Sequence, residues 1–258
     1  SSAKDKKELS NINYDKKNIL NKSQNFKNLI VKKPWGHEYL FFSSPEVSVW
    51  ILKIFKNHKT SMHCHTNKKT SLILAEGIAN LYSLNGIIKI ESGNVVAIDK
   101  GAFHRTSAEF DRDITVIEIE TPTNKYDIVR YKDDYQRSSS GYETKNFYSK
   151  ADKKDENITY ESINSSPKIL GECEIKTIKI DQLWEIESSA LISPLKIKKF
   201  DKNSSIMPGE VYEKNFLLNQ KSITNFQEFL VINKKQSPIP FSELVEVQEK
   251  IFEAIEGK

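Results

Sequence analysis

The sequence predicts an all-β fold, with short strands that pair antiparallel in a barrel or a sandwich. The first observation is a series of short runs rich in apolar and β-branched residues, at 47–55, 71–84, 87–92, 94–99 and 114–120. The second is the presence of turn residues between these runs, such as Asn85-Gly86 and Asp99-Lys100-Gly101, which suit tight hairpins. Because no helical pattern separates the strands, consecutive strands are expected to be neighbours in one barrel or sandwich.

Composition divides the chain into four segments. Residues 1–30 are polar and rich in Asn and Lys, and we expect an arm or a packing helix with a weak apolar stripe at 19–30. Residues 31–137 hold the predicted barrel, and residues 138–167, rich in Ser, Lys, Asp and Asn, predict a linker or surface excursion. Residues 168–258 predict a second β-rich unit, either a further sheet layer or a degenerate copy of the barrel. It ends in a helix that is a candidate homodimer contact.

The composition also excludes several classes of partner. No apolar run approaches the length that crosses a bilayer, so we expect no membrane partner, and the basic start of the chain lacks the apolar stretch of a secretory signal. The net charge of +4 comes almost wholly from lysines spread along the chain, which does not favour nucleic-acid binding. The two cysteines, Cys64 and Cys173, provide no disulfide framework, and this favours a reducing, cytoplasmic setting.

Three of the five histidines fall in one pattern, His63-Cys64-His65 followed by His104. Residues i and i+2 of a strand point to the same face, so His63 and His65 project together. A strand on the opposite side of a closing barrel can bring His104 to them, and Gly101 suits a turn that re-aims this strand. Converging neutral imidazoles bind divalent transition metals, namely Zn, Mn, Fe, Co or Ni. The alternative is that the three are unconnected surface or core histidines.

Four segments carry a resemblance to a known family. KTSMHCHTNKKT (59–70) and SGNVVAIDKGAFH (92–104) resemble the two cupin motifs, HxH-x(3,4)-E and G-x5-PxG-xx-H. KPWGHEY (33–39) and DIVRYKDDY (127–135) resemble the entry and closing motifs of the type II mannose-6-phosphate isomerase domain, which is also found at the C-terminal end of mannose-1-phosphate guanylyltransferases. The resemblance covers about residues 31–137. It implies a cupin barrel, that is, a double-stranded β-helix or jelly roll.

The resemblance implies that His63, His65 and His104 occupy metal-ligand positions, although His63 stands where the isomerases have Gln. It also shows one departure, since Thr70 stands where the family places a metal-binding glutamate. Two interpretations follow: a three-histidine centre with open positions, or a site that binds metal weakly and has lost the isomerase chemistry. Strand alternation places Glu76 on the same face as Thr70, as a candidate substitute for the missing carboxylate.

Other polar residues are candidates for binding and catalysis. The candidate substrate-binding residues are Lys68, Lys69, Thr70, Arg105 and Arg130. The lysines offer point charges and the arginines rigid forks for phosphate oxygens; the alternatives are solvated loop lysines and arginines paired with Asp133 or Asp134. The candidate general bases are Glu38, Glu76 and Glu120.

These features together predict a metal-dependent isomerase or epimerase that acts on a sugar phosphate or activated sugar in surface-polysaccharide biosynthesis. In the isomerase family the metal polarises substrate oxygens while a base moves a proton between neighbouring carbons through an enediol. One rival is a three-histidine Fe(II) oxygenase. The other is a non-catalytic sugar-binding or regulatory protein, which the loss of the glutamate at position 70 permits.

Overall fold

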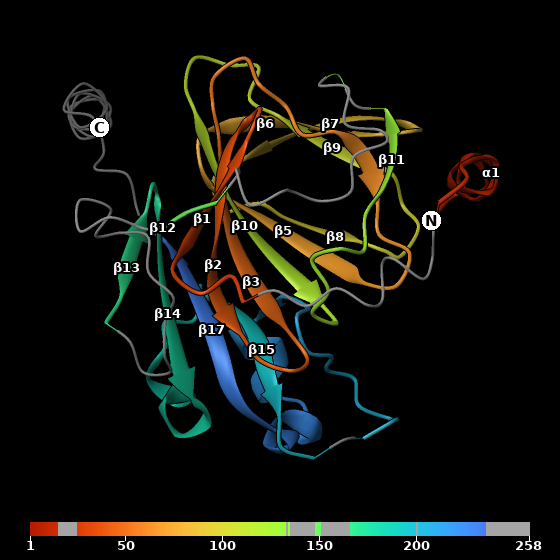
Figure 1. Cartoon of the computed structure of the whole chain (residues 1–258). Helices are drawn as coiled ribbons and strands as arrows, with labels where there is room; N and C mark the ends of the chain where they lie inside the picture. The colour runs from red at the N-terminus through yellow and green to blue at the C-terminus, as the bar shows by residue number, and fades with distance from the viewer. Residues whose placement is uncertain (15–24, 133, 135–147, 151–165, 200, 236–258) are drawn as a thin grey trace, which may run out of the picture.

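The computed structural model describes residues 1–14, 25–132, 134, 148–150, 166–199 and 201–235 of the 258-residue chain. Three antiparallel sheets make up this part of the chain (Figure 1). Two of them face each other as a barrel, and the third packs on the outer face of the first. The predicted all-β fold, a barrel followed by a further β-rich part, is confirmed.

The first sheet has seven strands in the order β12-β1-β2-β3-β10-β5-β8. Their bounds are Tyr148–Lys150 for β12, Leu29–Lys33 for β1, Gly36–Ser43 for β2, Ser48–Ile54 for β3, Ile114–Thr121 for β10, Lys69–Glu76 for β5 and Val95–Ile98 for β8. The second sheet has five strands in the order β11-β4-β9-β6-β7. Their bounds are Val129–Lys132 for β11, Met62–Cys64 for β4, His104–Ser107 for β9, Ile78–Ser83 for β6 and Gly86–Glu91 for β7.

The core of the barrel follows the two-residue period of its strands. Trp50 and Leu52 of β3 and Leu72 and Leu74 of β5 point inward and pack with Val116 of β10. Alternate residues of these strands point outward, away from the barrel. Toward one end of the barrel the inward positions of β5 and β10 change from apolar to polar, and the candidate site lies at this end.

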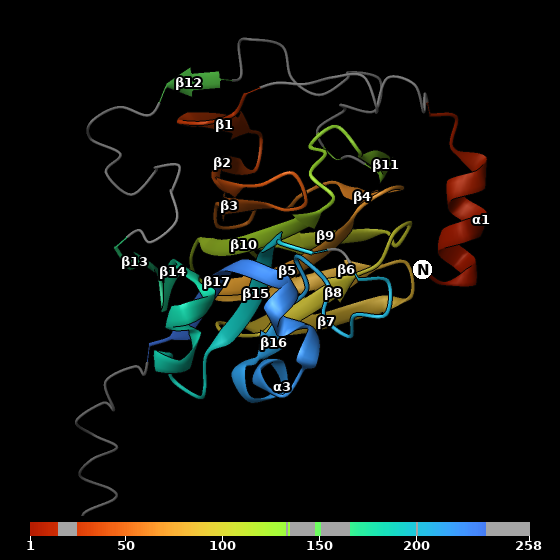
Figure 2. The same cartoon turned by 90° about the horizontal axis from the view of Figure 1, so that it is seen from below.

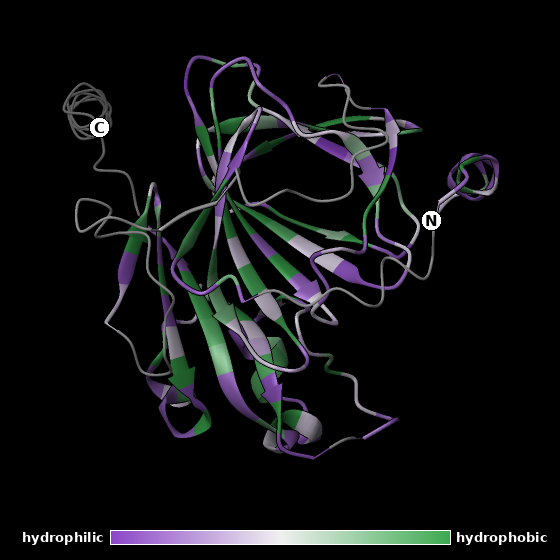
Figure 3. Cartoon of the chain, in the orientation of Figure 1, coloured by the Kyte–Doolittle hydropathy of each residue, from purple (hydrophilic) through white to green (hydrophobic). Residues whose placement is uncertain are grey.

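The third sheet has the order β13-β14-β17-β15-β16. Its strands are β13 Lys168–Leu170, β14 Cys173–Lys179, β17 Phe226–Lys234, β15 Leu191–Ile197 and β16 Tyr212–Glu213, with the short helices η2 Ile180–Glu185, α3 Lys214–Leu218 and η3 Lys221–Asn225. Leu195 and Leu230 pack against the outward Ile51, Ile73 and Ile117 of the first sheet, where Figure 3 shows hydrophobic residues along the strands. The described part of residues 168–258 is thus a further sheet layer. The domain boundaries at 137 and 168 stay a prediction.

Helix α1, Ala3–Asn11, lies on the side of the barrel away from β13 and β14 (Figure 2). It begins with a capping box, in which the Ser2 hydroxyl accepts from the Asp5 amide and the Asp5 carboxylate accepts from the Ser2 amide. Asp5 also accepts from the amide of Phe103, at 3.2 Å, which ties the helix to the residue before β9. No helix among the described residues is long and apolar enough to cross a bilayer.

Two predicted segments lie outside the described residues. They are the C-terminal helix and most of the 138–167 excursion, whose residues 148–150 form β12. Part of the apolar stripe expected at 19–30 lies outside as well, while Leu29 and Ile30 belong to β1.

Candidate metal centre

Three histidines meet inside the barrel, at the ends of two adjacent strands. His63 of β4 lies opposite His104 of β9 in the strand register, and His65 follows the end of β4. One ring nitrogen from each residue lies within 4.8 Å of the others, and all three side chains are buried. The predicted convergence of these histidines is therefore present, and the group has the donor set of a divalent transition-metal site.

The orientation of each ring is fixed by a backbone carbonyl. The Nδ1 atoms of His63, His65 and His104 lie 2.8, 2.5 and 3.1 Å from the carbonyl oxygens of residues 61, 127 and 102. A carbonyl oxygen only accepts, so each Nδ1 carries the proton and each Nε2 keeps its lone pair. The Nε2 of His65 is buried without a hydrogen-bond partner. A bound metal ion would satisfy this atom, and carbonyl-held imidazoles of this kind are usual in metal sites.

The electrostatic environment keeps these imidazoles neutral. Burial is the largest cause that lowers the pKa of His63 and of His65 well below 6.5. Burial also lowers the pKa of His104 to about 4. Since a metal ion binds the neutral imidazole, the three residues are in the ligand form at neutral pH.

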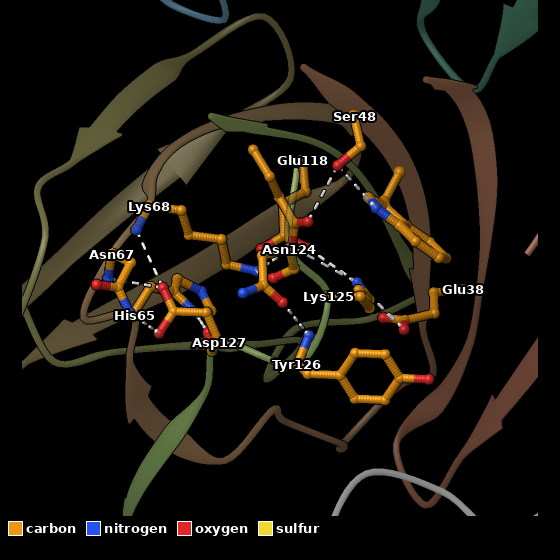
Figure 4. A network of polar contacts seen from close by, with 12 residues as sticks. Glu38, Ser48, His65, Asn67, Lys68, Glu118, Asn124, Lys125, Tyr126 and Asp127 are labelled. Carbon is orange, nitrogen blue, oxygen red and sulfur yellow. Dashed lines mark hydrogen bonds and ion pairs between the residues drawn. The ribbon is translucent and has the colours of Figure 1, made fainter. Parts of the chain in front are cut away.

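Asp127 and Gly101 hold the ligand segments in place. The buried Asp127 carboxylate accepts from the amides of Thr66, Asn67 and Lys68 at 3.0, 2.7 and 3.0 Å, while its carbonyl accepts from His65 (Figure 4). Gly101, at φ +72°, donates its amide to the carbonyl of His65 at 2.7 Å. The loop after β4 and the turn before β9 are thus joined around His65. In the sequence, Asp127 is marked only as the first residue of the DIVRYKDDY segment.

A cavity of about 40 Å³ adjoins His63 and His65 inside the barrel, and its wall is highly charged. Besides Arg130, the charged side chains that line it are Lys33, Glu38, Lys125, Glu118, Glu120 and Lys68. Lys68 pairs with Glu120 at 2.6 Å, and Lys125 lies 3.2 Å from Glu38 and 3.7 Å from both Glu118 and Glu120. Three cations and three carboxylates are therefore buried as mutually compensating pairs, as buried charges require.

The carboxyl groups of this wall differ in proton affinity. Burial, reinforced by the charge of Glu120, raises the pKa of Glu118 to about 7. Burial pushes the pKa of Glu38 upward too, but Lys125 and Lys33 outweigh it and hold that pKa below its ordinary value. Neighbouring carboxyl groups whose pKa values are pushed apart are the usual arrangement for an acid and a base in one site.

The candidate carboxylates take three different positions. Glu120 lies in the charged wall and accepts from the Ser48 hydroxyl at 3.1 Å, and Glu38 lies in the same wall. Glu76 lies outside the cavity, where it pairs with Lys53 at 2.8 Å and accepts from Thr115 at 2.7 Å. The expected alternation fails there because a β-bulge between β5 and β10 turns Glu76 to the outer face of the sheet.

The residues of the ligand loop divide between the interior and the surface. Lys68 is buried in the charged wall, whereas Lys69 is half exposed and pairs with Glu210 at 3.1 Å and Asp99 at 3.7 Å. Thr70 is buried opposite Glu120 in the β5–β10 register, and its hydroxyl has no hydrogen-bond partner.

The two candidate arginines differ in their access to the cavity. Arg130 of β11 lines the cavity and lies opposite His63 in the strand register. Arg105 pairs with Asp134 at 3.4 Å, which is one of the ion pairs considered as an alternative. Arg130 is therefore the arginine that lies beside the histidines.

Sequence reasoning missed Lys33, Glu118 and Lys125 as parts of the site. A signal existed for Glu118, because it alternates with Glu120 on the inward face of an otherwise apolar strand. Lys125 follows β10 in a loop and has no periodic pattern to mark it, yet its Nζ packs 3.9 Å from the centre of the Trp50 ring.

Comparisons with known proteins extend only to part of the fold. No family model matches the chain, and no curated protein matches it. Among solved structures, a cupin-superfamily sugar phosphate isomerase from Silicibacter pomeroyi is 20% identical, with a TM-score of 0.29 over 30% of this chain and 52% of that chain. KdgF from Halomonas sp. is 14% identical, with a TM-score of 0.34 over 36% and 84% of the two chains. A cupin-2 domain from Rhodospirillum rubrum is 10% identical, with a TM-score of 0.35 over 40% and 75%. The chain spans about half the length of the isomerase, so its function has to be argued from its own residues.

Proposed function

We propose that this chain is a metal-dependent isomerase or epimerase that moves a proton between neighbouring carbons of a sugar phosphate or activated sugar. The observation that supports it best is that three neutral histidines lie beside a cavity wall of buried carboxylates and lysines. A divalent transition metal (Zn, Mn, Fe, Co or Ni) held by His63, His65 and His104 would supply Lewis acidity that stabilises negative charge on a substrate oxygen. The mannose-6-phosphate-isomerase-type motifs agree with this reaction class.

Glu120 is the proposed general base. It is buried in the cavity wall, and its hydrogen bonds with Lys68 and Ser48 fix the position of the carboxylate. Lys68 also acts on the histidines, since its charge contributes to the lowered pKa of His65. Glu118, whose pKa burial raises to about 7, is the proposed acid on the same strand.

Arg130 is the proposed contact for an anionic group of the substrate. It lies at the side of His63, and a guanidinium matches phosphate oxygens with two parallel hydrogen bonds. Lys68 is less suited to this role because Glu120 already compensates its charge at 2.6 Å. A homodimer and a cytoplasmic role in surface-polysaccharide biosynthesis belong to the same proposal.

Metal content is the first test. We expect near-stoichiometric metal by mass spectrometry in the purified chain and its loss in a His63→Ala/His65→Ala variant. His58→Ala, outside the histidine cluster, is the matched control and should keep the metal. A chain that binds nothing when metal is supplied would contradict the proposal and favour the non-catalytic binding role.

Proton transfer is the second test. Mannose 6-phosphate incubated with the metal-loaded chain in D2O should gain deuterium at carbon 2, as followed by NMR, and Glu120→Gln should abolish this exchange. Oxygen consumption by an iron-loaded chain, without deuterium exchange, would instead establish the oxygenase alternative.

A further inference from the structure

A second, larger cavity touches the metal centre from the other side. Its volume is about 500 Å³, and it lies between the β6–β7 hairpin, the edge strand β8 and the first turn of α1. His104 lines this cavity, whereas His63 and His65 line the charged one. The histidine cluster thus forms the boundary between a small charged space and a large one.

The walls of the large cavity are mainly apolar. Leu81 of β6, Val96 of β8 and Phe103 before β9 line it, together with Ile87 and Ile88 of β7, which are 58% and 51% exposed. Ile88 lies opposite the inward Leu81 in the β6–β7 register, so it is the exposed isoleucine whose side chain turns toward the cavity.

Several polar groups of this lining are already engaged within the chain. Asp5 accepts from Ser2 and from the Phe103 amide, and the Ser83 hydroxyl donates to the carbonyl of Gly86 at 3.2 Å. These groups cap a helix and close a hairpin. They do not present a row of donors for a polyhydroxylated ligand, so the cavity favours an apolar occupant.

Size separates the roles of the two cavities. The charged cavity of about 40 Å³ has room for only a few water molecules or a small head group. Pockets that hold small-molecule ligands usually measure roughly 300–1,000 Å³. The large cavity lies within this range, and it is the one of the two that can hold the body of a substrate.

We propose that the large cavity binds the apolar body of an amphipathic small molecule whose oxygen-bearing head reaches the three histidines. This inference rests on the metal centre of the proposed function and narrows its substrate. The sugar would carry an aliphatic or aromatic group, which Leu81, Ile88 and Phe103 would cover. A plain sugar phosphate would leave this surface unused.

Alkyl hydroxamic acids test the inference, because their two oxygens chelate a transition metal and their tails vary in length. The full chain loaded with Co²⁺ is titrated with acetohydroxamic, hexanohydroxamic and octanohydroxamic acids, and binding is followed by the visible absorption of the metal. We expect the affinity to rise roughly threefold to fourfold for each added methylene until the tail fills the cavity.

Two exposed isoleucines provide a matched pair of variants. Ile88→Asp should weaken octanohydroxamate binding at least tenfold while leaving acetohydroxamate binding unchanged. Ile169→Asp, at a 45% exposed position on β13, should change neither. The cavity proposal would be overturned if the affinity did not depend on tail length, or if Ile88→Asp weakened the binding of both acids equally. Neither result would contradict the proposed metal centre. Failure to bind Co²⁺ or acetohydroxamate would overturn both.

Discussion

Asp127 offers a direct test of how the metal centre is held together. Its two carboxylate oxygens accept from the amides of Thr66, Asn67 and Lys68 and from the Thr66 hydroxyl, and its carbonyl orients His65. Asp127→Asn keeps the shape of the side chain but replaces one acceptor oxygen with a donor. If the amide nitrogen takes the place of Oδ2, the bonds from the Asn67 and Lys68 amides are lost. If it takes the place of Oδ1, the bond from the Thr66 amide is lost, while the Thr66 hydroxyl can turn to accept.

The magnitude follows from the partners that are lost. A hydrogen bond to a charged group contributes about 1.5–3 kcal/mol and a neutral one about half as much, so one lost bond and the weakened remaining bonds together amount to about 3–6 kcal/mol. Asn67 is exposed and water can satisfy its amide, whereas Lys68 is buried. We therefore expect the free energy of unfolding to fall by about 3 kcal/mol, the lower end of the range. Loss of the support for the ligand loop should also weaken metal binding by about tenfold to a hundredfold.

Urea unfolding of the metal-free chain and competition with a chromophoric zinc chelator measure the two effects. Asp201→Asn is the control, because the Asp201 carboxylate accepts one amide, that of Asn203, at 2.9 Å on the surface. The reasoning is refuted if Asp127→Asn matches the wild type in both measurements, or if Asp201→Asn shows the same losses.

Two further predictions concern stability. The pKa of Glu118 is about 7 in the folded chain, above its ordinary value of 4.5. Between these two pH values the folded chain therefore binds more protons than the unfolded chain. The free energy of unfolding consequently falls as the pH rises from 4.5 to 7. Glu118→Gln should remove this decrease, so that at pH 8 its free energy of unfolding exceeds that of the wild type by up to about 3 kcal/mol. Parallel pH profiles of the two chains in urea unfolding would contradict this prediction. Gly171→Ala should cost more than about 2 kcal/mol, since Gly171 has φ +56° and a Cβ would lie 2.2 Å from the Cβ of Glu76. Gly86→Ala, where a Cβ would meet nothing within 4 Å, should cost far less in the same measurement, and equal costs would refute the close contact.

The parts of the site that the sequence predicts depend on local periodicity. His63 and His65 share a face because they are two apart in one extended segment, and a turn at Gly101 brings His104 to them. For Glu76, strand alternation predicts the wrong face of the sheet. Its direction depends on a bulge opposite Thr115 and Val116, on a strand some forty residues away, and the sequence around Glu76 does not encode that pairing.

The charged wall is beyond local prediction for a similar reason. Lys33 and Glu38 come from the paired strands β1 and β2 and Lys125 from a loop much later in the chain, and each charge is tolerated inside the barrel only because the others are there. Taken alone, each residue resembles an ordinary surface charge. The role of Asp127 is equally non-local, since its partners lie sixty residues earlier in the chain.

The third sheet determines which surfaces of the molecule are open to assembly. It covers the back of β3, β5 and β10, and it is bound there by hydrogen bonds from Ser71 to the carbonyl of Gly209 and from Thr121 to that of Pro208. The outer face of these three strands is thus closed to other subunits by the chain itself. The second sheet, which carries His63 and His104, is covered in part by Leu9 and Ile12 of the N-terminal segment. A homodimer formed through the uncovered part of this sheet would place its contacts close to the metal centre, so that assembly and catalysis would share one side of the barrel.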